Sequence, residues 1–372
     1  PASISVFVRV QAQSRRTATP ARNIRVLNNT NGNALYVLDG AVFNSGTTNQ
    51  TKNLFAGSGW GGTSYSGIRS AAPFAILDTM LSAARFVVDN GNSMLDLPAL
   101  DVYWSPLNNS ASGDVTLGQI ESTLFTTDGP APGIYVLGDE NDDTDEYDQH
   151  VLAHEFQHFL EYSISRSESP GGPHSPNDRL DLRVAFSEGF ANAFSAMVLG
   201  DPLYSDSLGS QQGRRFSFSM ESNVTSPAGW YNEASIQSVT WDLFDAAVDG
   251  AGAGADSIAL GYKPLYQALT GRFRTGPALT SVYPFIIDLK GQAGAPVAAI
   301  DALVTSQSIH VTDEWGTNET NDGSVQQALP LYARLTLNGG AKSVCGTRSV
   351  GTYNKIGNRS FLRFSSAAAR AV

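Results

Sequence analysis

His154-Glu155-Phe156-Gln157-His158 is the stretch from which the interpretation of this 372-residue chain starts. On an α-helix, residues four apart project from one face, so both imidazoles can reach one tetrahedral zinc ion. Glu155 would then lie beside the metal as a base that takes a proton from water. Acidic residues precede the stretch, and its flanks carry an apolar stripe typical of a helix, formed by Val151, Leu152, Phe156, Phe159 and Leu160. The pattern predicts a helix that holds zinc.

A catalytic zinc needs a third protein ligand, because it has three and keeps its fourth position open. Residues 185–194 predict a second amphipathic helix, on which Glu188, Asn192 and Ser195 share a narrow polar face. We expect Glu188 to be the third ligand. His174 and Asp181 are the alternatives, although residues 167–176 are rich in Ser, Pro and Gly and favour a loop.

The sequences of the two expected helices resemble those of the gluzincin metallopeptidases. They are Leu-Ala-His-Glu-Phe-Gln-His at 152–158 and Ser-Glu-Gly-Phe-Ala-Asn at 187–192. Among the gluzincins, the chain is most similar to the hyicolysin-like secreted bacterial enzymes. The resemblance implies a zincin-like core in which Asn192 hydrogen-bonds His154 or His158. It also implies a zinc endopeptidase in which Glu155 returns the proton to the leaving amine.

An amide-hydrolysing enzyme of this kind needs a hydrogen-bond donor for the tetrahedral oxyanion. Tyr231, in Gly-Trp-Tyr-Asn at 229–232 before an expected helix, is the predicted donor, with Tyr204 and His174 as alternatives. No acidic exopeptidase segment accompanies the motif, which favours an endopeptidase. Two other classes stay open: an inactive zincin-like binding or adhesion module, and a zinc hydrolase of a non-protein substrate. The intact Glu155 disfavours the binding module, which has no need of a base.

The acidic run at 139–146 allows a calcium site, because Asp139, Asn141, Asp143 and Asp145 alternate as oxygen donors do. The run lacks the glycine and the distal glutamate of an EF-hand loop. The other interpretation is a solvated acidic turn that caps the motif helix. His150 precedes His154 by one helical turn, where a supporting or surface histidine is expected rather than a ligand.

Composition favours an exported bacterial protein. The net charge of −11 argues against nucleic acid or an anionic membrane as partner, and no apolar run of about 18 residues or more is present. Low lysine content and a start at Pro1 predict a mature secreted protein, or a periplasmic one, that acts as a monomer on protein or peptide substrates. The single cysteine, Cys345, excludes intrachain disulfides and is expected to be buried.

The pattern along the chain predicts an α+β fold in three segments. Residues 1–70 are expected to be β-rich, 71–323 to form the zincin-like catalytic domain with a mainly helical half, and 324–372 to be β-rich again. Alternation predicts strands at 4–10, 34–38, 100–104, 133–137, 331–337 and 361–364. Periodicity predicts helices at 72–88, 233–248, 263–270, 278–290 and 297–306, besides the two motif helices.

Overall fold

The computed structural model describes residues 3–128, 132–221, 226–246, 258–336, 338–344 and 354–365, and it confirms the predicted α+β class. Two compact units are present, one made of residues 1–159 and 204–218 and the other of residues 160–203 and 219–372. The predicted division at residues 70 and 323 stays a prediction. Cys345 lies outside the described residues, as do the ends of the expected helix 233–248 and strand 331–337.

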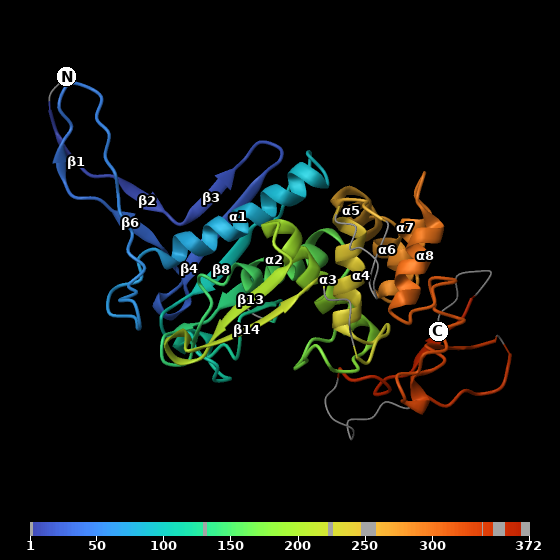
Figure 1. The fold of residues 1–372 in the computed structure, drawn as a ribbon. Helices are drawn as coiled ribbons and strands as arrows, with labels where there is room; N and C mark the ends of the chain where they lie inside the picture. The colour runs from blue at the N-terminus through green and yellow to red at the C-terminus, as the bar shows by residue number, and fades with distance from the viewer. Residues whose placement is uncertain are drawn as a thin grey trace. The chain divides into compact units, whose positions relative to one another are not determined.

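The first unit is built on a six-stranded sheet (Figure 1). The strands follow the order β3-β4-β8-β10-β9, and β5 pairs with β4 beside this path. β4, β8 and β10 run parallel, whereas β3, β5 and β9 are antiparallel to their neighbours, which leaves β9 as an edge strand. The bounds are β3 Gln13–Arg16, β4 Arg22–Asn28, β5 Ala34–Leu35, β8 Leu100–Trp104, β9 Leu124–Thr126 and β10 Gly133–Val136.

Alternating side chains give this sheet two buried faces. On one face, Tyr103 and Tyr135 stack with ring centroids 4.6 Å apart in a cluster that includes Leu27. The other face carries mainly β-branched residues that suit a pleated surface. Helix α1, Ala72–Asn90, packs against β4 and β3. Both faces are therefore covered, and the second consists of Ile24, Val26, Leu100, Val102, Ile134 and Val136.

Short two-stranded ribbons complete the first unit. The predicted strands at 4–10 and 34–38 are present, each broken into two pieces. The ribbon of β13 and β14 was not predicted, because its Ser, Asp and Arg residues give no apolar alternation. The pairs are β1 Ser5–Val6 with β7 Phe43–Asn44, β2 Arg9–Gln11 with β6 Val37–Asp39, β11 Gly138–Asp139 with β12 Asp143–Thr144, and β13 Leu203–Leu208 with β14 Arg214–Ser219.

The motif helix is α2, Gln149–Ile164, as the sequence predicts. It begins directly after the acidic run, and the backbone carbonyl of Asp148 accepts a hydrogen bond from the amide of Leu152. Asp148 is thus the residue that immediately precedes the first turn of α2. The boundary between the two units falls inside this continuous helix, so its last turn belongs to the second unit.

The second unit is mainly helical, and α3 and α4 are its most closely packed pair. Rings of Phe186, Phe190, Phe273 and Phe285 form its aromatic centre. The expected helix at 278–290 begins later, at Val282, because Ser281 before it is in an extended conformation. The bounds are α3 Leu182–Leu199, α4 Glu233–Phe244, α5 Tyr262–Thr270, α6 Arg272–Thr275, α7 Val282–Lys290, α8 Val297–Ser306, and the parallel strands β15 Tyr332–Arg334 and β16 Phe361–Arg363.

Candidate metal centre

The two motif histidines lie on one face of α2, as their spacing predicts. The Nε2 atoms of His154 and His158 are 3.0 Å apart, with ring centroids separated by 4.8 Å. His154 is buried and His158 is half-buried. Two ring nitrogens that converge on one point are placed to share a single cation.

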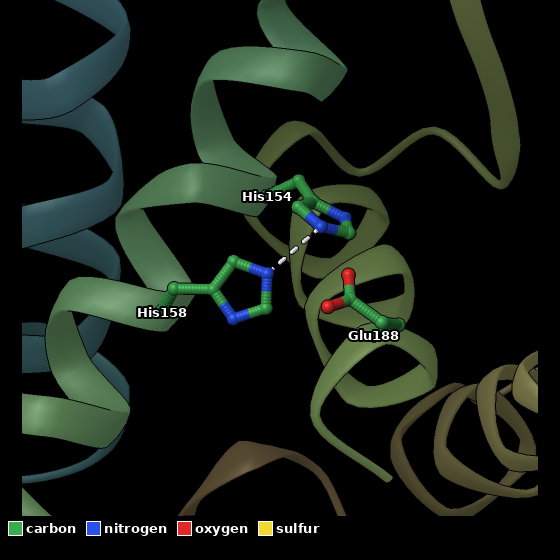
Figure 2. A group of neighbouring side chains, drawn as sticks. All are labelled: His154, His158 and Glu188. Carbon is green, nitrogen blue, oxygen red and sulfur yellow. Dashed lines mark hydrogen bonds between the residues drawn. The ribbon is translucent and has the colours of Figure 1, made fainter. Parts of the chain in front are cut away.

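Glu188 of α3 joins this pair (Figure 2). One ligand atom from each of His154, His158 and Glu188 lies within 4.8 Å of the others. The last turn of α2 is fixed to α3 next to this point, because the Ser187 hydroxyl donates a 2.6 Å hydrogen bond to Glu161 Oε2. Two imidazoles and one carboxylate are a donor set that zinc prefers, so the residues fit a catalytic zinc with three protein ligands.

Gly189, next to Glu188, allows a close approach between helices. A Cβ atom at this position would meet the Glu233 carbonyl oxygen at 2.5 Å and Ile236 Cβ at 2.6 Å. The close packing of α3 against α4 therefore requires glycine at position 189. The contact places the start of α4 directly beside the Glu188 turn of α3.

Glu155, the expected base, is buried and oriented by the edge strand of the sheet. The backbone amide of Phe125 in β9 donates a 2.6 Å hydrogen bond to Glu155 Oε2. A hydrogen bond to an ionised carboxylate is stronger than one between neutral groups, and it holds the side chain in one orientation. This contact could not be predicted from the sequence, because a backbone donor carries no residue signature.

His174 lies between two carboxylates in the second unit. Its Nδ1 is 2.6 Å from Glu233 Oε2, and its Nε2 is 3.3 Å from Glu188 Oε2. Burial opposes the charged imidazole, but the two glutamates outweigh it and raise the pKa of His174 to about 11. A ring held by Glu233 through Nδ1 presents its other N–H toward Glu188.

Two fully buried asparagines hold the loop on either side of His174. The side-chain amide of Asn354 donates to the carbonyls of Gly172 and Pro173 at 3.1 and 2.6 Å. The amide of Asn232 donates to the carbonyl of Pro176 at 2.7 Å. These bonds anchor an exposed loop to buried side chains, and they fix the position of the histidine.

If this centre hydrolyses peptides and uses His174, replacing Asn354 with aspartate is expected to lower turnover by about tenfold to a hundredfold, with little change in KM or zinc content. The change removes both amide donors to the loop, and a small displacement of a catalytic group has effects of this size. The measurement is steady-state hydrolysis beside zinc analysis and melting temperature.

Lys355→Met is the matched control for Asn354→Asp. Lys355 ties the same C-terminal segment to the loop through Asp178, away from the carbonyls next to His174. Equal losses of turnover in the two variants at equal melting temperature would show that Asn354 only stabilises the loop.

The other side chains predicted for the site are held by partners outside the metal group. The Tyr231 hydroxyl is 2.9 Å from the Ala228 carbonyl and 3.1 Å from Asn321 Oδ1, so neighbouring loops hold it. The Asn192 amide donates to Gln237 Oε1 of α4 at 3.0 Å. Asp181 caps α3 and pairs with Arg183. None of these belongs to the metal group found among the described residues, and the predicted roles of Tyr231 and Asn192 stay predictions.

Two aromatic residues near the start of α2 contact each other. His150 is buried edge-on against Tyr204, with ring centroids 5.3 Å apart. The Tyr204 ring in turn stacks on Phe218 at 4.7 Å. Burial and several nearby aspartates raise the pKa of Tyr204 well above its usual range. These contacts give both residues a packing role in the first unit.

The acidic run does not gather its four alternating side chains. Asp139 and Asp143 accept backbone amides, of Asn141 at 2.9 Å and of Thr144 at 3.0 Å. In the part of the chain that the structure describes, Asp145 instead lies with Asp148 and Asp206 of β13, one oxygen from each within 4.8 Å of the others. Burial, with repulsion from neighbouring aspartates, raises the pKa of Asp148 to about 6 and of Asp206 to about 7.

These shifts predict that Asp206→Asn becomes more stabilising as the pH rises. A carboxyl with a raised pKa in the folded state contributes stability below its unfolded pKa, and this is lost as pH rises through about 7 for Asp206. We expect the melting temperature of Asp206→Asn relative to wild type to increase by roughly 3–5 °C from pH 5 to 7.5. A difference independent of pH would contradict the shifted pKa.

The same two proteins test the calcium interpretation. Melting curves at pH 7.5 with millimolar Ca²⁺ or Mg²⁺ at matched ionic strength separate specific binding from screening. A rise specific to calcium that Asp206→Asn abolishes supports an ion in this region. Equal melting temperatures support an acidic turn without calcium.

Comparison with known proteins gives one family match. A model described as the Mycolysin C-terminal domain matches residues 120–263, a segment that includes both motif histidines, Glu155, Glu188 and Tyr231. The match covers less than half of the chain, and it relates this segment to the secreted zinc metallopeptidases. No curated protein matches the chain. None of the described helices is long and apolar enough to cross a membrane.

Proposed function

We propose that this protein is an exported bacterial zinc endopeptidase whose metal ligands are His154, His158 and Glu188. The observation that carries the proposal is the convergence of these three side chains, with Glu155 buried next to His154 on the same helix. A site that only binds zinc has no use for that glutamate. The family match to residues 120–263 supports the same class.

Glu155, His174 and Glu233 have separate roles in the proposed reaction. When bound, zinc would supply a Lewis acid that polarises water and the scissile carbonyl. Glu155, oriented by the Phe125 amide, takes a proton from the attacking water and returns it to the leaving amine. We assign the oxyanion donor to His174 rather than Tyr231, whose hydroxyl is held by Ala228 and Asn321. The Nε2–H of His174 lies 3.3 Å from the proposed ligand Glu188, and it would turn from that carboxylate to the oxyanion when zinc holds Glu188. Glu233 holds the opposite ring nitrogen and so keeps the donor aimed.

The position of β9 favours a peptide over another substrate. β9 ends the described order of the sheet, so one side of its backbone faces away from β10. An extended peptide can add to such an edge through main-chain hydrogen bonds. The Phe125 amide is already donated to Glu155, so a peptide paired with other backbone groups of this edge would pass next to the base.

A peptide library blocked at both ends tests this function. An endopeptidase cleaves such peptides internally, and we expect cleavage that a chelator stops and added zinc restores. An aminopeptidase would require a free amino end. Zinc-loaded protein that is inert toward blocked and free peptides and toward unfolded casein would favour the binding module, or a hydrolase of a non-protein substrate.

A further inference from the structure

A cavity of about 220 Å³ lies in the first unit, where α1 packs beside β3 and β4. Three arginines line it: Arg16 at the end of β3, Arg22 at the start of β4, and Arg85 of α1. No residue of the candidate metal centre lines this cavity.

The backbone brings two of these charges together. Arg16 and Arg22 are directly opposite partners in the antiparallel β3–β4 ladder, so their side chains project from the same face. Like charges in this arrangement are destabilising. Both are nevertheless fixed by their own hydrogen bonds: Arg16 donates to the Ala18 and Thr19 carbonyls, and Arg22 Nε donates to Ser14 Oγ at 3.0 Å. That bond uses only Nε, so the terminal N–H groups of the Arg22 guanidinium take no part in it.

Three guanidinium groups line the cavity against one carboxylate, that of Asp89. Elsewhere in the first unit Arg9 pairs with Asp39 and Arg25 with Asp101, each at 2.7 Å. Among the described residues, neither Arg16, Arg22 nor Arg85 forms an ion pair, and Asp89 is the acidic residue at the cavity. Burial and repulsion from Arg85 and Arg16 lower the pKa of Arg22. This concentration of positive charge stands in a chain of net charge −11.

We propose that this cavity binds a multiply charged oxyanion, phosphate or sulfate, either free or as the end group of a larger molecule. Planar guanidinium groups bind such oxygens with paired, charge-assisted hydrogen bonds. Three of them around one cavity supply both the charge and the donors. The site is independent of the proposed peptidase activity.

Calorimetric titration at constant ionic strength, with chloride as the background anion, tests the proposal. Inorganic phosphate and sulfate are the probes, and glycerol phosphate separates a free ion from an end group, because tighter binding of the monoester indicates the larger ligand. We expect saturable binding by wild type, weakened about tenfold or more in Arg22→Gln and in Arg85→Gln. Arg15→Gln is the control: Arg15 is exposed, neighbours Arg16 on β3 and projects from the other face.

Thermal melting gives a second readout that does not depend on calorimetric sensitivity. Without the anion, Arg85→Gln should melt at the wild-type temperature or above it, because repulsion is relieved. With phosphate, wild type should rise above the variant. Absence of saturable binding, binding by the glutamine variants equal to wild type, or no change in the melting order would each overturn the proposal.

Discussion

Glu155→Gln is expected to reduce turnover by about a thousandfold or more while leaving the zinc content unchanged. Glutamine keeps the size of the side chain and can still accept the Phe125 amide through its carbonyl oxygen, but it cannot take a proton from water. The measurement is initial rates on a blocked peptide, with metal analysis on the same preparation.

Glu121→Gln is the control for the loss of one carboxylate. Glu121 is exposed and does not belong to the metal group, so its variant should retain wild-type rates. A zinc-loaded Glu155→Gln variant that hydrolyses peptide at the wild-type rate would remove Glu155 from the mechanism and leave the metal site without its proposed base.

Alanine at His154, His158 or Glu188 is expected to lower zinc from about one ion per chain to nearly none, and to abolish turnover with it. Each change removes one of three protein ligands to an ion that a tetrahedral site binds only with all of them in place. Metal analysis after dialysis against zinc-free buffer measures the loss. Circular dichroism of the same samples checks that the helices remain.

His310→Ala is a suitable control for histidine removal, because His310 pairs with Glu319 and is half-exposed, with 48% of its side chain accessible. It should keep its zinc. If Glu188→Ala retained full zinc while His174→Ala or Asp181→Ala lost it, the third ligand would be wrong. The capping bond that Asp181 Oδ1 accepts from the Arg183 amide argues against Asp181, and the metal content decides.

The three candidate ligands could be selected from the sequence because they follow helical periodicity. His154 and His158 are one turn apart, and Glu188 was found from the polar face of a second helix. Neither inference needs the tertiary structure. What the sequence does not contain is the approach of α3 to its neighbours, which depends on Gly189 against α4 and on Ser187 against Glu161.

The surroundings of the site were not accessible in this way. His174 meets Glu233 across 59 positions, and Asn354 meets Gly172 across 182, so no local period relates these residues. Tyr231 was chosen because it precedes a helix, yet the direction of its hydroxyl depends on Asn321 of a distant loop. Asp206 lies beside Asp145 and Asp148 but belongs to β13, a strand whose polar sequence did not predict it. Loop and backbone partners are fixed by tertiary packing, which overrides local pattern.

A zinc titration of turnover asks whether one zinc held by His154, His158 and Glu188 serves peptide hydrolysis. Metal-free protein is titrated with zinc while the cleavage of a blocked peptide is followed. We expect no turnover without zinc, a linear rise to a maximum at about one equivalent, and no further gain. Turnover that is independent of zinc, or protein that binds one equivalent and cleaves nothing, would contradict this role of zinc.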